Sequence, residues 1–385
     1  MQRFTVSCVL VTGLLLGLLA GCVPSEGQNI SNATTEVANT GDLLIPDSQE
    51  AESPIRLKVM IAGSLMAPFA ELEAAYEADH PNVDVEVEAH GSIQVIRHVT
   101  EIGDLVDVVA PADYTLIPMM MYQTPVPDSQ QMFADWSLEF AGNKLALAYT
   151  PNSAMADQIT ADNWFEILAN PDVRLGLSDP RFDASGYRTM MIAQLAESYY
   201  SKPTIFEKIF AGRFTNAITV QKEGDKSIIH IPEILEPRDD SNIVMRGSSI
   251  ALIALLETGE IDYALEYESV IKQQNLLYIP LPDELNLGNP DLTEAYAQVQ
   301  VQLDFQRFTS ITPVFDGAPI GYGITIPANA PHPAEALDFI KFVVGPEGQA
   351  IMAAVQHPAL EISWSDNCAA VPANLQTFCQ EKPQP

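Results

Sequence analysis

The sequence predicts an α/β fold made of two α/β lobes joined by two crossing strands. After residue 55, apolar strands alternate with amphipathic helices, an order typical of a mostly parallel sheet covered by helices. A second α/β unit follows an extended apolar segment at 143–150. A strand and a helix at 322–344 then return the chain to the first unit. Two lobes that share two strands are typical of a hinged binding protein.

The first lobe begins with a strand at 55–62 and a helix at 66–79. The helix is expected because its apolar residues recur every three or four positions and so share one face. Alternating residues predict a strand at 83–89, and an apolar face predicts a second helix at 93–102. A further strand and loop follow at 106–114.

The second lobe starts where the extended segment leaves the first. The acidic stretch from Lys222 to Asn242 is interpreted as an exposed insertion. The other elements expected are a strand and loop at 173–180, a helix at 186–200, a strand at 261–270, a strand at 322–328 and a helix at 335–344.

Composition excludes two classes of partner. The 385 residues include 19 Lys and Arg against 51 Asp and Glu, a formal net charge of −32, and 47% are hydrophobic. This length and apolar fraction suffice for two packed units. A chain with this much negative charge repels phosphate backbones and anionic lipid headgroups. We therefore expect that it binds no nucleic acid and makes no contact with a membrane surface through a basic patch.

The first 21 residues predict export. They hold one cation, Arg3, and an apolar run at 9–20 that is too short for a membrane span, which needs about 20 residues. Small residues then precede Cys22, an arrangement that resembles a bacterial lipoprotein signal in which this cysteine is lipidated. The alternative is an ordinary secretory peptide with an incidental Cys22. Either segment is removed, and lipidation would anchor the protein to the outer face of the cell membrane through its N-terminus only.

These observations give a domain organisation in five parts. The expected parts are a lipoprotein signal peptide at 1–21, a flexible tether at 22–54, lobe I at 55–142 plus 318–365, lobe II at 143–317, and a C-terminal tail at 366–385.

The tail carries Cys368 and Cys379. Two nearby cysteines in an exported protein most simply form a local disulfide. A metal pair is the alternative, although no CxxC motif or neighbouring histidine accompanies them.

Catalytic and metal templates are absent from the sequence. The six histidines lie far apart without an HExxH or HxH motif, and there is no GxSxG, Walker A or GxGxxG motif. We therefore expect no enzyme, no catalytic residue and no cofactor.

A repeated Gly-Ser pair predicts an anion site. Gly63-Ser64 and Gly91-Ser92 each lie where a strand ends and a helix begins. Glycine permits a close turn, and the free N–H groups of a helix start carry partial positive charge, so two such starts suit a small oxyanion. The alternative is that Ser64 and Ser92 are simple helix caps.

Longer segments around these pairs resemble the tungstate- and molybdate-binding proteins of ABC importers. The resemblance rests on AGSL (62–65), HPNVDVEVEAHGSIQVIRHVTE (80–101), DVVAPADYTLIPMM (107–120), SDPRFDASGYR (178–188), LLETGEIDYALEYESV (255–270) and TPVFDGAPIGYGITIPANAPHPAEALDF (312–339). It implies the type II periplasmic-binding-protein fold, molybdate or tungstate as ligand, no added cofactor, and an ABC permease with its ATPase as partners. A monomer is expected.

The resemblance also implies a set of site residues. Gly63, Ser64 and Ser92 match the family's serine-bearing turns. Asp183 matches an aspartate whose carboxylate contacts the molybdenum or tungsten of the bound oxyanion. The remaining matches are Ala184 and Ser185, which offer backbone N–H groups, and Tyr267, a tyrosine at the ligand.

One position departs from the family. Ser249 stands where the family has a glutamate that supplies a second carboxylate. This difference leaves two coordination schemes open, six-coordinate metal binding or hydrogen bonding to a four-coordinate oxyanion.

Other interpretations of these residues remain. Asp183 also suits a loop cap, and Tyr267 a half-buried core position. Strand alternation points Glu266 and Glu268 away from Tyr267, so we expect both to be surface acids. At the level of function, the alternatives are a binding protein for another oxyanion such as sulfate, and an exported hydrolase with Asp183 as base.

Overall fold

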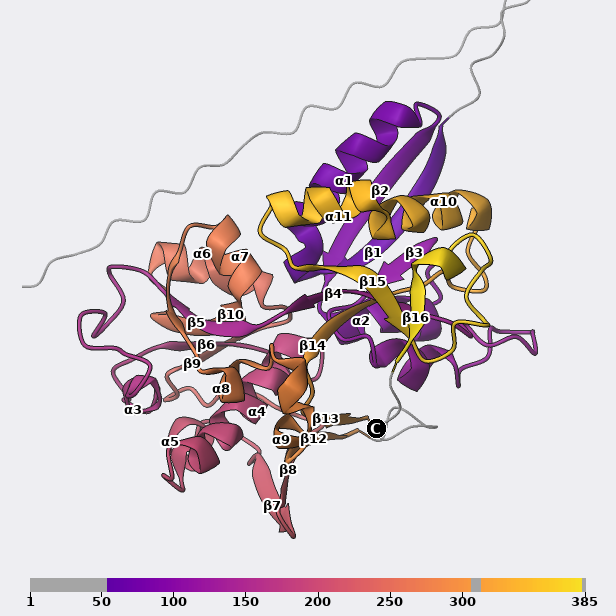
Figure 1. Cartoon of the computed structure of the whole chain (residues 1–385). Helices are drawn as coiled ribbons and strands as arrows, with labels where there is room; N and C mark the ends of the chain where they lie inside the picture. Colours follow the sequence, from indigo (N-terminus) through magenta and orange to yellow (C-terminus); the bar gives the residue numbers. More distant parts are fainter. Residues whose placement is uncertain (1–53, 306–312, 383–385) are drawn as a thin grey trace, which may run out of the picture. The chain divides into compact units, whose positions relative to one another are not determined.

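Four sheets organise residues 54–305 and 313–382, the part of the chain that the computed structural model describes (Figure 1). These residues belong to one compact unit, Glu52–Pro385. The predicted signal peptide, Cys22 and the tether up to residue 53 lie outside the described residues.

The first sheet has the parallel order β2-β1-β3, as the alternation of elements predicted. Its strands are β1 (Ile55–Ala62), β2 (Val83–His90) and β3 (Val108–Ala110), and its helices are α1 (Met66–Asp79) and α2 (Ser92–Arg97). Ala62 pairs with His90, so β1 and β2 end side by side. The Gly-Ser pairs that follow them therefore lie at the same edge of the sheet.

The second sheet has the order β14-β4-β15-β16 and joins residues from three parts of the chain. Its strands are β4 (Leu138–Asn143), β14 (Ile320–Ile324), β15 (Ala359–Ser365) and β16 (Cys379–Glu381), accompanied by α10 (Pro333–Val344) and α11 (Pro346–Ala354). A disulfide joins Cys368 to Cys379. Beyond it, the Lys382 ammonium contacts the Glu139 carboxylate on β4.

The third sheet has the order β11-β5-β10-β6-β9. Its strands are β5 (Leu145–Tyr149), β6 (Leu175–Ser178), β9 (Ile243–Arg246), β10 (Tyr263–Tyr267) and β11 (Leu277–Pro280). The chain enters it from the second sheet at Lys144, between β4 and β5, and re-enters the second sheet at β14. Two crossing segments therefore connect the sheets, as the sequence predicted.

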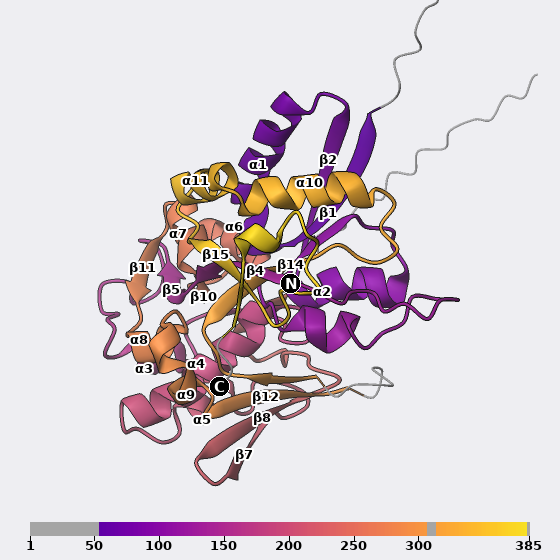
Figure 2. The same cartoon turned by 45° about the vertical axis from the view of Figure 1, so that its right-hand side comes forward.

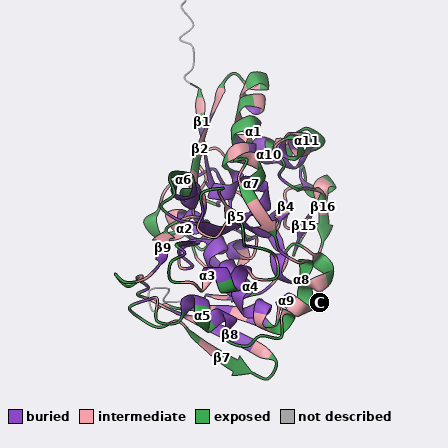
Figure 3. Cartoon of the chain, turned by 90° about the vertical axis from the view of Figure 1, so that its left-hand side faces the viewer, coloured by how far each residue is buried: buried purple, intermediate pink, exposed green. Residues whose placement is uncertain are grey.

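One of the helices between β5 and β13 is almost entirely buried. Residues Ala184–Ala196 of α4 (Ala184–Tyr199) are buried (Figure 3). The other helices here are α3 (Trp164–Leu168), α5 (Ile205–Phe210), α6 (Ile250–Thr258), α7 (Glu268–Gln273), α8 (Asp283–Asn286) and α9 (Thr293–Tyr296). The short helical turns are η1 (Gly63–Leu65), η2 (His98–Ile102), η3 (Ile117–Met121), η4 (Pro290–Leu292) and η5 (Gln376–Phe378).

The fourth sheet corrects one prediction. Its order is β13-β12-β8-β7, and Figures 1 and 2 place it beyond α4 and α5. Its strands are β7 (Thr219–Glu223), β8 (Lys226–Pro232), β12 (Val299–Asp304) and β13 (Val314–Asp316). The prediction of an exposed insertion at 222–242 is wrong for β8, because Ile229 and Ile231 are fully buried where β8 pairs with β12. The flanking acids concealed this short apolar alternation.

Candidate functional site

Three helices begin close to one another, at residues that the sequence singled out. α2 begins at Ser92, α4 follows Asp183 and α6 follows Ser249. A Cβ on Gly91 would lie 2.5 Å from the Phe182 carbonyl oxygen and 2.7 Å from that of Gly247. Only glycine permits this approach between the start of α2 and the loops that precede α4 and α6.

The turn after β1 reaches the same helix α6. A Cβ on Gly63 would lie 2.6 Å from Cγ2 of Ile250, the first residue of α6. Both glycines of the predicted anion site therefore lie against the segments around the starts of α4 and α6.

The Asp183 side chain links the three helix starts. Its Oδ2 accepts a 2.7 Å hydrogen bond from the Ser249 N–H. Burial raises the pKa of Asp183, while hydrogen bonds from the backbone N–H groups of Ser249 and Ser92 act against that rise. The carboxylate makes no capping hydrogen bond to its own helix, so it serves the neighbouring helices instead. A negative group at helix N-termini is favourable, because the free N–H groups there carry partial positive charge.

Ser249 has a second carboxyl neighbour, which overturns an expectation. Its hydroxyl donates to Glu266 Oε1 at 3.1 Å, and Glu266 is 0% exposed. Alternation does place Glu266 on the opposite face of β10 from Tyr267, but α6 packs over that face. Burial, with the nearby Asp183 charge, raises the pKa of Glu266 to about 8.

Glu268 is also not a surface acid, since it is only 8% exposed. It begins α7 rather than continuing the strand, and its carboxylate pairs with Lys144 at 3.2 Å and Lys272 at 2.6 Å. These two lysines balance the charge of Glu268.

The two predicted serine hydroxyls have partners within the protein. Ser64 Oγ lies 2.9 Å from the Tyr322 hydroxyl, which also accepts a 3.1 Å hydrogen bond from the Asn143 amide. Ser92 Oγ accepts a 3.0 Å hydrogen bond from the Ala112 N–H. Both hydroxyls therefore tie the Gly-Ser turns to segments that the sequence did not connect with them.

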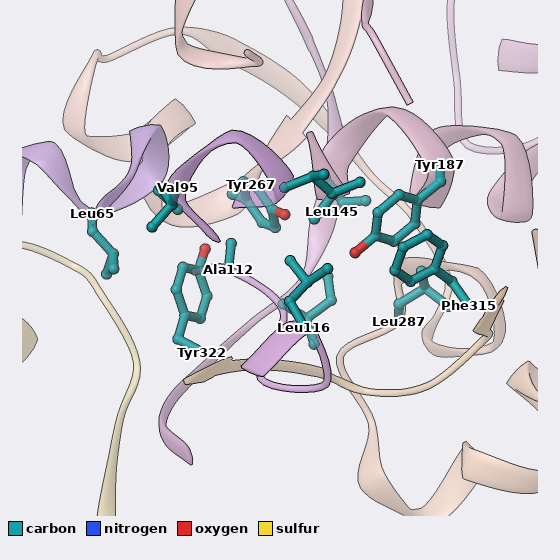
Figure 4. Close-up of a cluster of buried hydrophobic side chains, with 14 of the residues drawn as sticks. Leu65, Val95, Ala112, Leu116, Leu145, Tyr187, Tyr267, Leu287, Phe315 and Tyr322 are labelled. Atoms are coloured by element: carbon teal, nitrogen blue, oxygen red, sulfur yellow. The ribbon is translucent and has the colours of Figure 1, made fainter. Parts of the chain in front are cut away.

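The other predicted residues lie nearby and are buried. Ala184 and Ser185 start α4, and the Ser185 hydroxyl donates to the Leu265 carbonyl at 3.4 Å. The Tyr267 ring packs 6.0 Å from the Tyr322 ring, and Figure 4 shows both beside Ala112.

Sequence reasoning missed Arg188, the cation of this region. Its guanidinium donates to the Tyr267 hydroxyl at 2.9 Å and to the Ala112 carbonyl at 2.7 Å. It also lies 3.3 Å from the Asp113 carboxylate, which accepts the Tyr187 hydroxyl at 2.6 Å. The available signal was a single charged residue, an arginine, within the otherwise uncharged stretch 184–196.

A cavity of about 300 Å³ adjoins this arginine. Asp113 lines it from the first sheet's side, and Tyr187 and Arg188 line it from α4. Tyr187 stacks on Phe315 at 4.3 Å between ring centres (Figure 4). Solvent-sized space therefore reaches the buried guanidinium.

Neither a metal-binding cluster nor a membrane-spanning helix is found in the part of the chain that the structure describes. Within residues 54–305 and 313–382, no three His, Cys, Asp or Glu side chains cluster in a way that could hold a metal ion. Across the same described residues, no helix combines the length and apolarity needed to cross a bilayer.

Comparison with known proteins gives full-length relatives. An uncharacterized solute-binding protein of Methanoculleus marisnigri is 40% identical over 333 residues, covering 86% of this chain and 89% of that protein. The molybdate/tungstate-binding protein WtpA of Thermococcus kodakarensis is 36% identical over 354 residues, covering 90% and 89% respectively.

Solved structures agree on the type II periplasmic-binding-protein fold. The sulfate-binding protein SubI of Mycobacterium tuberculosis superposes with a TM-score of 0.50 at 12% identity, covering 86% of this chain and 94% of that one. The family model described as bacterial extracellular solute-binding protein matches residues 57–354. With this match spanning both crossing segments and every helix start of the site, the chain belongs to the bacterial extracellular solute-binding proteins.

Proposed function

We propose that this protein captures molybdate or tungstate outside the cytoplasm and delivers it to an ABC permease and its ATPase. The observation that carries the proposal is the buried Asp183 carboxylate, held by backbone N–H groups at the starts of α2 and α6. The ligand would lie among Gly63, Ser64, Ser92, Asp183, Ala184, Ser185, Ser249 and Tyr267. The 36% identity to the molybdate/tungstate-binding WtpA supports this ligand class.

The chemistry of an oxyanion explains why a carboxylate belongs there. A carboxylate repels the oxygens of a bound dianion unless it contacts the central atom. Molybdenum and tungsten accept additional oxygen ligands, whereas the sulfur of sulfate does not. Asp183 therefore favours the metal oxyanions, while N–H and O–H donors in a buried site hold the oxygens.

Sulfate is the second candidate, because Ser249 lacks the carboxylate that the resemblance predicts. A hydrolase has less support. The family is one of solute-binding proteins.

The cellular setting is part of the proposal. Export follows from the family, and lipidation of Cys22 would keep the exported chain at the membrane. In this arrangement, lobe I (55–142 plus 318–365) and lobe II (143–317) close on the ligand as a monomer. Mass spectrometry of the native protein should find a lipid-modified N-terminus at Cys22, and an unmodified N-terminus elsewhere would rule out the anchor.

A thermal-shift panel tests the ligand. Purified protein is heated with molybdate, tungstate, sulfate or phosphate, each at equal concentration. Ligand at 1,000 times its dissociation constant adds about 4.1 kcal/mol to stability. We expect molybdate and tungstate to raise the melting temperature and sulfate to leave it unchanged. Equal shifts with sulfate would contradict the proposal.

A further inference from the structure

The two oxygens of the Glu266 carboxyl group have unequal surroundings. Oε1 accepts two hydrogen bonds, one from the Ser249 hydroxyl at 3.1 Å and one from the Tyr267 N–H at 2.8 Å. Oε2 is buried and has no hydrogen-bond partner among the described residues. A buried polar atom without a partner is uncommon and requires an explanation.

Within the part of the chain that the structure describes, no cation pairs with the Glu266 carboxyl group. Arg188, the buried cation nearby, contacts Tyr267, Ala112 and Asp113. The titratable groups that interact with Glu266 are Asp183 before α4, Tyr267 on β10 and Tyr322 on β14. One of these is an acid that adds repulsion, and burial raises the pKa of both tyrosines.

The residues that face Glu266 from the adjacent strand β5 and the start of α6 are uncharged. Across the sheet, Glu266 pairs with Ala146 of β5, and α6 begins with the apolar Ile250. A fully buried carboxyl group with an acidic neighbour and no cation is most stable when protonated. The pKa of about 8 agrees with a neutral group at pH 7.

The proton belongs on Oε2, because Oε1 already accepts from two donors. Ser249 then stands between two acids, giving its N–H to Asp183 and its O–H to Glu266. Glu266 contacts two of the predicted ligand residues, Ser249 and Tyr267, through Oε1, and its Oε2–H has no acceptor among the described residues.

We infer that Glu266 is a further ligand-binding residue, a neutral carboxylic acid whose Oε2–H donates a hydrogen bond to the bound oxyanion. This inference rests on the proposed function. A neutral donor adds attraction for a dianion without adding a like charge. It supplies a second carboxyl group to the site where Ser249 cannot.

Three variants test the inference by calorimetric titration with tungstate at pH 7. Glu266→Leu removes the donor and should weaken binding at least tenfold, because a hydrogen bond to a charged group is lost. Glu266→Gln keeps a neutral donor and should restore most of that loss. Glu268→Gln is the matched control, two residues along the chain and directed to Lys144 and Lys272, and should bind as the parent does.

A pH comparison of the parent and Glu266→Gln keeps the test valid if Glu266→Leu does not fold. Between pH 7 and 9.5 the parent should lose affinity as Glu266 loses its proton, and Glu266→Gln should lack that component. The inference is overturned if Gln binds as weakly as Leu, if Leu binds as tightly as the parent, or if both pH profiles coincide. A parent that binds no oxyanion overturns the proposed function itself, and the inference with it.

Discussion

The backbone N–H of Ser249 lies 2.7 Å from Oδ2 of Asp183, so the residue before α6 is bonded to the residue before α4. Asp183 also accepts from the Ser92 N–H at the start of α2. One buried carboxylate thus bonds segments that are more than 150 positions apart in the chain. The structural role of this carboxylate and its role toward a ligand can be separated by substitution.

Replacing Asp183 with Ala should lower tungstate affinity at least tenfold, because a contact to the central atom is lost. Sulfate binding should stay unchanged or improve, because a repelling charge is removed. Calorimetric titration with both anions measures the two effects. Asp183→Asn, which keeps the shape and one acceptor oxygen, is the control for folding. Tungstate affinity equal to the parent's in Asp183→Ala would show that the carboxylate is not a ligand.

Ser249→Ala keeps the N–H that Asp183 uses and removes only the hydroxyl. It should weaken every oxyanion alike by about one ordinary hydrogen bond, roughly 1 kcal/mol, because the Glu266 carboxyl group loses a donor. Titration with tungstate, molybdate and sulfate checks this uniformity. A loss confined to tungstate would instead assign Ser249 a role at the metal.

Gly91→Ala should destabilise the fold by about 1–3 kcal/mol, because the new Cβ meets two backbone oxygens that cannot move independently. Gly247→Ala is the matched control, since its Cβ would approach only the Gln94 side chain, at 3.8 Å. Chemical denaturation of both variants measures the difference. Equal stabilities would mean that the start of α2 does not need this close approach.

His357 should make stability fall in acid. Its ring is buried without a hydrogen-bond partner among the described residues, and burial lowers its pKa from 6.5 to about 3. Between these values the unfolded chain binds a proton that the folded chain excludes, so the free energy of unfolding decreases as pH falls. Denaturation from pH 7 to pH 4 should show a weaker pH dependence in His357→Leu than in the parent. His230→Gln, at a half-exposed position on β8, should retain the parent's dependence.

The periodicity of apolar residues was sufficient to predict the strands and helices of the first sheet from the sequence. The apolar face of α1 and the alternation of β2 are local patterns, and parallel strands in register place Gly63-Ser64 beside Gly91-Ser92. The sequence alone therefore suffices to predict that Ser64 and Ser92 are neighbours.

Glu266 could not be identified in the same way. Alternation gives the face of β10 on which a side chain lies, but it does not say that α6 covers that face. The partners of Arg188 are likewise residues of distant segments, Asp113 and Tyr267. Long-range packing decides which charged residues are buried, and no local pattern records it.

The C-terminal disulfide has a consequence for association between molecules. Cys379 begins β16, the three-residue strand that covers the outer side of β15. Without it, the N–H and C=O groups of β15 would form an open sheet edge, which is a template for pairing with another chain. The bond to Cys368 and the contact of Lys382 with Glu139 keep this short strand in place. Reduction of the disulfide would therefore promote self-association through the edge of β15.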